Sequence, residues 1–94
     1  MCNLTPNATN DPVLPIIHLN GTSADELVRA RQKAIQKLDE ALQALAEMRP
    51  HGRDYYLEEG RLQIAEAQHT ARMREVTAVR DDITREMTSL LGYL

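Results

Sequence analysis

The chain has 94 residues, a single cysteine, no Phe or Trp, and a formal net charge of −3. One domain of this size buries little apolar surface, so we expect copies of the chain to associate. The acidic balance argues against broad binding of DNA or RNA and against an anionic membrane surface.

The sequence contains no apolar run long enough for a signal peptide or a membrane span. We therefore expect a cytoplasmic protein with no membrane partner. Cys2, the lone cysteine, has no intrachain partner for a disulfide.

Residues 1–22 are predicted to form an N-terminal arm, and residues 23–94 a single helical domain. Prolines within the arm exclude a long helix, so we expect an extended or short-helical segment. Its apolar stretch Val13–Leu19 is expected to lie in a groove rather than in water. Asn20 and Gly21 then predict a tight turn built from residues that tolerate positive φ.

The first helix is predicted over Ala24–Met48. Ser23 is its expected N-cap, Glu26 completes a capping box, and Pro50 stops the helix. Free N–H groups at its start would suit an anion, and an ordinary capped end is the alternative. The apolar positions recur every three or four residues and predict an amphipathic helix: Leu27, Ala30, Ala34, Leu38, Ala41, Leu45 and Met48, widened by Val28, Ile35 and Leu42.

The second helix is predicted over about residues 61–91, ending at Gly92. Being longer than the first, it should overhang it with Ile83–Leu91, which would need cover from another subunit. In the loop, Tyr55 and Tyr56 either close the hairpin end or offer a stacking platform. The predicted fold is all-α, a long antiparallel helical hairpin that is oligomeric. The apolar positions of this helix are Leu62, Ala65, His69, Met73, Val76, Val79, Ile83, Met87 and Leu90.

No catalytic constellation can be recognised. His18, His51 and His69 are scattered, with no cysteine or carboxylate at metal-ligand spacing. We therefore expect no metal, no cofactor and no enzymatic activity. His69 falls on the apolar stripe, where a packed, hydrogen-bonded histidine is expected.

A row of cations is one candidate binding feature. Arg29, Lys33 and Lys37 stand four residues apart on one helix face, where like charges repel. An anion held between subunits would relieve this repulsion. The alternative is an ordinary solvated face, neutralised in part by Glu26 and Glu40.

Arg74 is the second candidate. Small residues surround it on the predicted helix, so that a neighbouring subunit can approach closely and gather several copies of Arg74 around one anion. The alternative is an exposed arginine paired with Asp81 or with another acidic side chain. The small neighbours are Ala67, Thr70, Ala71, Thr77 and Ala78.

Two short segments resemble a known family. His18–Ser23, which reads HLNGTS and leads into a helix, and Gly52–Tyr56, which reads GRDYY between two long helices, are similar to those of the phage anti-CBASS proteins of the second type. These are viral immune-evasion proteins that act as nucleotide sponges. The resemblance implies an all-helical homohexamer in the host cell cytoplasm. It also implies sequestration of cyclic dinucleotides, such as cyclic GMP-AMP, and of cyclic trinucleotides, without cleavage.

The resemblance also implies site residues. His18 stands where family members place an aromatic residue that stacks on a base, and Lys33 where a lysine contacts the dinucleotide phosphate. Arg74 stands where an arginine contacts the phosphates of cyclic trinucleotides. The alternative is an oligomeric helical scaffold or adaptor with no nucleotide ligand. The implied dinucleotide site comprises His18, Asn20, Arg29 and Lys33, and the implied trinucleotide site Thr70 and Arg74.

Overall fold

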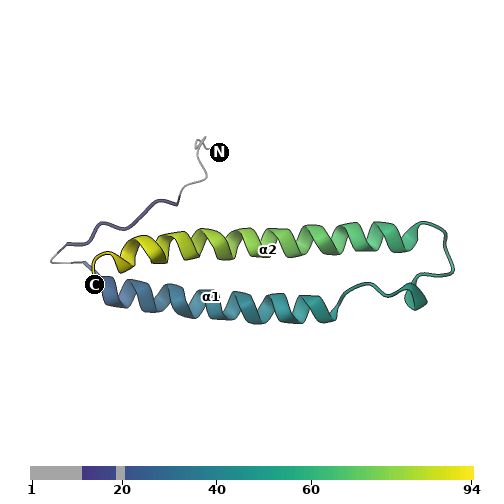
Figure 1. Ribbon diagram of the computed structural model, residues 1–94, viewed down its shortest axis with the longest axis horizontal. Helices are drawn as coiled ribbons and strands as arrows, with labels where there is room; N and C mark the ends of the chain where they lie inside the picture. Colours follow the sequence, from purple (N-terminus) through teal and green to yellow (C-terminus); the bar gives the residue numbers. More distant parts are fainter. Residues whose placement is uncertain (1–11, 19–20) are drawn as a thin grey trace.

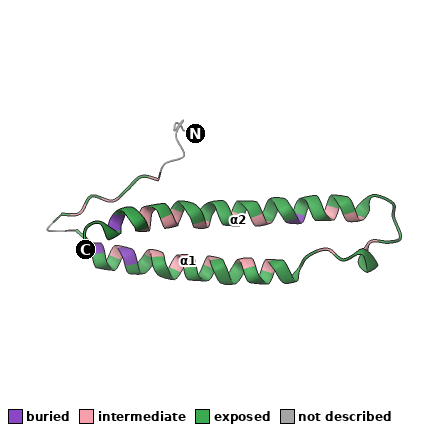
Figure 2. Cartoon of the chain, viewed as in Figure 1, coloured by how far each residue is buried: buried purple, intermediate pink, exposed green. Residues whose placement is uncertain are grey.

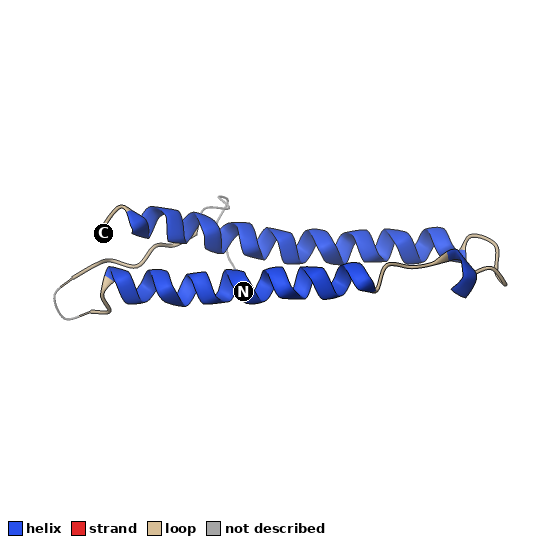
Figure 3. Cartoon of the chain, turned by 60° about the horizontal axis from the view of Figure 1, so that its bottom comes forward, coloured by secondary structure: helices blue, strands red, loops and turns tan. Residues whose placement is uncertain are grey.

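The computed structural model describes residues 12–18 and 21–94, and within these two ranges it is all-helical, with no strand. Helix α1 spans Ala24–Glu47, the short 3-10 helix η1 spans Gly52–Asp54, and α2 spans Arg61–Leu91. The long helices lie side by side and antiparallel, so that the end of α2 returns to the start of α1 (Figure 1, Figure 3). The predicted all-helical fold is confirmed, and its two long helices form a hairpin.

The start of α1 follows from its cap. Ser23 has an extended backbone, and its Oγ accepts a hydrogen bond from the amide of Glu26 at 3.2 Å. The Ser23 hydroxyl in turn donates to the Glu26 carboxylate at 3.2 Å. The predicted N-cap is confirmed, although Glu26 returns to the hydroxyl and not to the Ser23 amide of a standard capping box. The last helical residue is Glu47, one residue before the predicted end, and Met48 is the C-cap.

Helix α2 begins after a glycine in the left-handed region. Gly60 has φ 81°, a conformation that side chains with a Cβ rarely adopt. The side chain of Glu58 pairs with Arg61 at 2.6 Å, across this first turn. At the other end, Gly92 donates its amide to the carbonyl of Ser89 and closes the helix, as the sequence predicts.

The interior of the hairpin is thin. Leu90 is 1% exposed, and it lies with Ala24 and Val28 at the end where α1 begins and α2 ends (Figure 2). His69, further back along α2, is also buried. Elsewhere between the helices the apolar side chains are half-buried: Leu27, Ala34, Ile35, Leu38, Leu42 and Leu45 on α1, and Leu62, Ala65, Met73, Val76, Ile83 and Met87 on α2.

Parts of the predicted apolar stripes are wrong. On α1, Ala30, Ala41 and Met48 are exposed, because the face turned to α2 is rotated toward Val28 and Ile35. On α2, Val79 is 50% exposed and Arg80 is half-buried in its place, because Arg80 pairs with a carboxylate of α1.

The predicted overhang is also wrong. Leu90 is buried against the start of the hairpin, so Ile83–Leu91 does not project beyond α1. The extra turns of α2 lie at the loop end, where the first turns after Arg61 extend past the end of α1 (Figure 1). The long loop allows this register, because its residues span the gap between the helix ends.

Two ion pairs join the helices at different levels. Arg31 donates from Nε to Glu86 at 3.0 Å and from Nη1 to the carbonyl of Leu27 at 3.1 Å. Arg80 donates to both carboxylate oxygens of Asp39. The hydrogen bond and negative charge of Asp39 raise the pKa of Arg80 above its already high ordinary value. These pairs fix the register in which α1 and α2 meet.

The loop only partly closes the hairpin end. Tyr55 is half-buried, as expected of a side chain that covers the end of the hairpin, whereas Tyr56 is exposed. The expectation that the tyrosine pair closes the hairpin end is therefore wrong for Tyr56.

The apolar arm leaves side chains uncovered. Residues 12–18 run beside the last turns of α2 without regular secondary structure (Figure 1), and Leu14 borders a shallow groove there with Thr88. Val13 is 93% exposed and Ile16 is 82% exposed. The expectation that this stretch lies in a groove is wrong for these two side chains within one copy of the chain.

Candidate functional site

The three cations of the row on α1, Arg29, Lys33 and Lys37, differ in whether they form an ion pair. Arg29 pairs with Asp25, one turn earlier, and Lys37 Nζ lies 3.4 Å from Glu40 Oε1. Lys33, between them, makes no ion pair or hydrogen bond with any residue that the structure describes. The predicted neutralisation by Glu40 is confirmed. The structure therefore singles out Lys33 as the cation of the row that lacks a counter-charge in the described chain.

Lys33 also points away from α2. Arg31 and Ile35, two positions to either side, are half-buried and face the second helix. At 100° per residue, a side chain midway between them projects from the opposite side of α1. Lys33 is exposed there, available to a ligand or to another subunit.

The N-terminus of α1 is capped. The Ser23 hydroxyl accepts a hydrogen bond from the Glu26 amide. The Ser23 carbonyl accepts a hydrogen bond from the Leu27 amide at 3.0 Å. Glu26 is engaged with Ser23, and so the expectation that it neutralises Arg29 is wrong; Asp25 does so. The capped end is therefore the alternative that the structure supports.

The ring of His18 packs over Gly21. The Gly21 amide donates to the His18 carbonyl at 3.1 Å, and a Cβ added to Gly21 would lie 2.6 Å from His18 Nε2. This bond closes the predicted turn without a positive φ at Gly21, where the lack of a side chain makes room for the imidazole. Asn20 lies outside the described residues. Arg29 and Lys33 share one face of α1, but no hydrogen bond or ion pair within the described ranges joins His18 to either of them.

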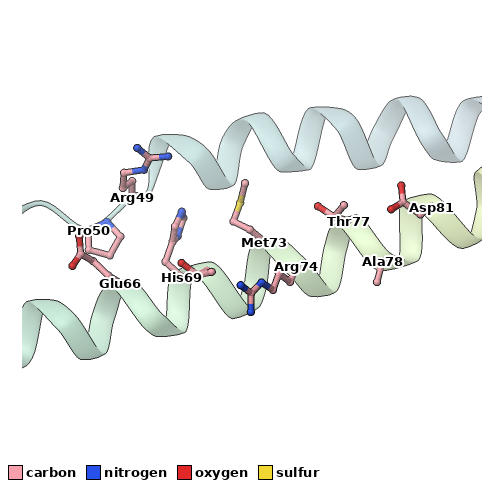
Figure 4. A pocket seen from close by; sticks show the side chains of 10 residues that line it. Arg49, Pro50, Glu66, His69, Met73, Arg74, Thr77, Ala78 and Asp81 are labelled. Atoms are coloured by element: carbon pink, nitrogen blue, oxygen red, sulfur yellow. The ribbon is translucent and has the colours of Figure 1, made fainter.

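A groove of about 650 Å³ runs along α2, beside the point where the chain leaves α1 (Figure 4). Thr70 and Arg74 both line it, so the structure brings together the two residues of the implied trinucleotide site. Arg74 lies on the exposed side of α2, whose neighbouring residues are small, as the sequence predicts. A second helix or subunit can therefore approach Arg74 closely.

Arg74 has no counter-charge in the part of the chain that is described. The expected alternative, a pair with Asp81, is wrong, because Asp81 lies 3.7 Å from Arg80 Nη1 and no contact to Arg74 accompanies it. Arg80 also donates to Asp39 on α1, so it pairs with carboxylates on both helices. Arg74 is thus left with its donors open to a ligand.

The groove also contains residues that sequence reasoning did not assign to a site. Arg49 and Pro50 border it from the end of α1, and Glu66 from α2. His69 is 7% exposed and points from α2 toward α1 beside them (Figure 4). Its packing is as predicted, but it has no hydrogen bond to a described residue. Nothing in the sequence marks Arg49, because a basic residue at a helix end is common and stabilises the helix dipole.

Other site classes find no support in the described ranges. They hold no group of three or more His, Cys, Asp or Glu side chains placed to bind a metal ion. None of their helices is both long and apolar enough to cross a membrane.

Comparison of the chain with protein-family models, with curated proteins and with solved structures finds no match. The resemblance to the anti-CBASS sponges rests on the two segments HLNGTS and GRDYY.

Proposed function

We propose that copies of this chain assemble into a homohexamer that sequesters cyclic dinucleotides, such as cyclic GMP-AMP, and cyclic trinucleotides. Binding without cleavage would block CBASS antiviral signalling in the cytoplasm of a phage-infected cell. One observation carries the proposal. Lys33 and Arg74 are exposed cations on separate helices, and neither has a counter-charge in the described chain. The neighbours of Lys33 in its row, Arg29 and Lys37, are paired, whereas Arg49 and Arg72 near Arg74 are not.

Exposed apolar surface supports assembly. The hairpin interior is thin, and large apolar side chains stay exposed at both of its ends, among them Val13, Ile16, Tyr56, Leu57 and Ile64. Monomeric proteins rarely leave such surface open, and burying it between copies is the usual solution.

The symmetry of the ligands suits such an assembly. A cyclic dinucleotide is a two-fold dianion and a cyclic trinucleotide a three-fold trianion. Subunits related by a matching axis present one cation to each phosphate. Lys33 would meet each dinucleotide phosphate, near Arg29 on the same helix face, while His18 stacks on a base and Asn20 lies beside it in sequence. Arg74, next to Thr70, would meet the trinucleotide phosphates with its planar guanidinium.

A pair of arginine variants tests the two-site form of the proposal. Arg74→Ala should abolish binding of cyclic trinucleotides and leave dinucleotide binding unchanged, as measured by calorimetry. Arg72→Ala is the matched control, because Arg72 is an exposed arginine of α2 outside the groove. Equal loss of both ligands in Arg74→Ala would show one shared pocket and contradict separate sites.

Co-purification distinguishes a sponge from a scaffold. Protein made in cells with active cyclic-nucleotide synthases should carry bound nucleotide, seen as excess absorbance at 260 nm. Ligand-free protein from such cells would favour the scaffold or adaptor alternative.

A further inference from the structure

One lateral face of α2 has the residue spacing of a helix-packing seam. Thr70 lies at its middle, with Glu66 and Arg74 four residues away on either side, and all three line the groove along α2. At about 100° per residue, these two are turned by about 40° from Thr70. Gln63 and Thr77, seven residues away on either side, are turned by about 20°. We call these five residues the Thr70 seam.

The Thr70 seam is open to a second helix. All five of its residues are exposed, and the short side chains of Ala67 and Ala78 lie beside it. Small residues let the axes of two packed helices come close together. The groove of about 650 Å³ along this face can therefore receive the side chains of another helix.

The two charged residues of the Thr70 seam have opposite signs and no partners. Neither Glu66 nor Arg74 forms an ion pair or hydrogen bond with a residue that the structure describes. Within one chain they are eight residues apart, which is about 12 Å along the helix axis. Each therefore lacks a counter-charge that the other could supply from a second copy.

A two-fold axis through Thr70 brings these opposite charges together. When two copies of α2 pack antiparallel about this axis, each residue faces the one that is equally far on the other side of Thr70. Arg74 then faces Glu66 of the partner subunit, and this ion pair occurs twice. Thr70 faces its own copy, and Thr77 faces Gln63 of the partner subunit. The Thr70 seam is thus complementary to itself in charge.

Other ways of pairing two α2 helices are less favourable. A parallel pairing sets Arg74 against Arg74 and Glu66 against Glu66, and these like charges repel. An antiparallel register that joins Arg74 to Asp81 uses a carboxylate that already lies 3.7 Å from Arg80 Nη1. The register centred on Thr70 instead joins a carboxylate and a guanidinium that both lack partners in the described chain.

We propose that the Thr70 seam joins two copies of the chain about a two-fold axis, and that Glu66 of the partner subunit covers Arg74 until a cyclic trinucleotide displaces it. The pairing follows from α2 itself, whereas the competition rests on the proposed function. A guanidinium that donates to a carboxylate cannot offer the same N–H groups to a phosphate. The two uses of Arg74 therefore exclude each other.

Oxidative cross-linking tests the register. Thr70→Cys in a Cys2→Ser background should form a disulfide between copies, because the axis brings the two thiols together. Thr77→Cys is the matched control, since it lines the same groove but its two copies lie about 21 Å apart along the helix axis in this register. Non-reducing gels measure the cross-linked fraction, and circular dichroism checks folding. Equal cross-linking of the two variants, or none of folded Thr70→Cys, would overturn the pairing and leave the proposed function standing.

Charge reversal tests the ion pairs. In the Thr70→Cys background, Glu66→Arg and Arg74→Glu should each slow cross-linking about tenfold, because like charges then face each other twice. The double variant should restore the rate. Glu75→Arg, which reverses an exposed charge of α2 outside the groove, is the control and should change the rate little. A double variant as slow as the single ones would show that Glu66 and Arg74 do not meet.

Calorimetry with cyclic triadenylate tests the competition. Glu66→Gln removes the competing carboxylate and should bind this ligand about tenfold more tightly than wild type, whereas the control Glu75→Gln should bind as wild type does. If Glu66→Gln and wild type bind equally, the competition is overturned and the proposed function stands. If neither binds, the proposed trinucleotide site fails and takes the competition with it, while the cross-link still decides the pairing.

Discussion

Counter-charges distinguish the cations of α1 from one another. Arg29 and Lys37 form ion pairs with carboxylates one turn or less away, whereas Lys33 forms none in the described chain. Exposed pairs of this kind contribute little to stability, but they lower the attraction of the paired cation for a ligand phosphate. Lys33 is therefore the residue of the row best suited to bind an anion.

Replacing Lys33 tests this reasoning at a single residue. Lys33→Ala removes one charged hydrogen bond, worth about 1.5 kcal/mol or more, from each half of a two-fold dinucleotide site. We expect at least a roughly 100-fold loss of cyclic dinucleotide affinity in calorimetry. Lys37→Ala, which removes a paired lysine one turn later, is the control and should change affinity little. Equal effects of the two variants would remove Lys33 from the site.

Gly21→Ala tests the position of the His18 ring. The new Cβ would lie 2.6 Å from His18 Nε2, so the imidazole must move. Because that ring is exposed, stability should change by no more than about 0.5 kcal/mol. Cyclic dinucleotide affinity should nevertheless fall, with trinucleotide affinity unchanged. Gly52→Ala, whose Cβ would meet only Leu62 at 3.8 Å, serves as the control. Unchanged dinucleotide binding in Gly21→Ala would show that the His18 ring does not contact the ligand.

Sequence reasoning found the candidate cations but not their surroundings. Spacing and small neighbours identified the row around Lys33 and the face around Arg74. That Lys33 alone in the row lacks a partner depends on which rotamers its neighbours adopt. That Arg49 lines the same groove as His69 depends on where α1 ends beside α2, and no local sequence pattern encodes this long-range arrangement.

For the two helices, local sequence patterns predicted where each helix ends but only partly predicted which residues face the other helix. Ser23, Pro50 and Gly92 mark the helix limits because capping and helix breaking involve only neighbouring residues. The rotation of each helix depends on its partner. Arg80 displaces Val79 from the interface because Asp39 lies opposite.

The half-buried pair between Arg31 and Glu86 gives a stability prediction. Their side chains are 21% and 23% exposed, so removing either one leaves a partly desolvated charge. Arg31→Met and Glu86→Met should each lower the free energy of unfolding by about 1–2 kcal/mol. The double variant should lose less than the sum of the two.

Urea unfolding at one fixed protein concentration measures these changes, since assembly links stability to concentration. Arg29→Met, which breaks an exposed pair, is the control and should cost at most about 0.5 kcal/mol. Additive losses in the double variant would show that the pair does not hold the helices in register.

For the whole molecule, the thin hairpin interior and the unpaired cations Lys33 and Arg74 both favour an assembly of several copies of the chain. Length and composition predicted the need for other copies, and the exposed Val13 and Ile16 strengthen that argument. The separate argument from an apolar overhang at Ile83–Leu91 is wrong, because the register of the hairpin places the extra turns of α2 at the loop end. The expected hexamer stays a prediction of the resemblance.

Native mass spectrometry with added cyclic di- and trinucleotides tests the central claim most directly, because it reports the number of subunits and of ligands together. Cations that converge from symmetry-related copies predict a hexamer that binds one dinucleotide per two subunits and one trinucleotide per three subunits. A folded single chain of 10.6 kDa, or an oligomer that takes up neither ligand, would contradict it.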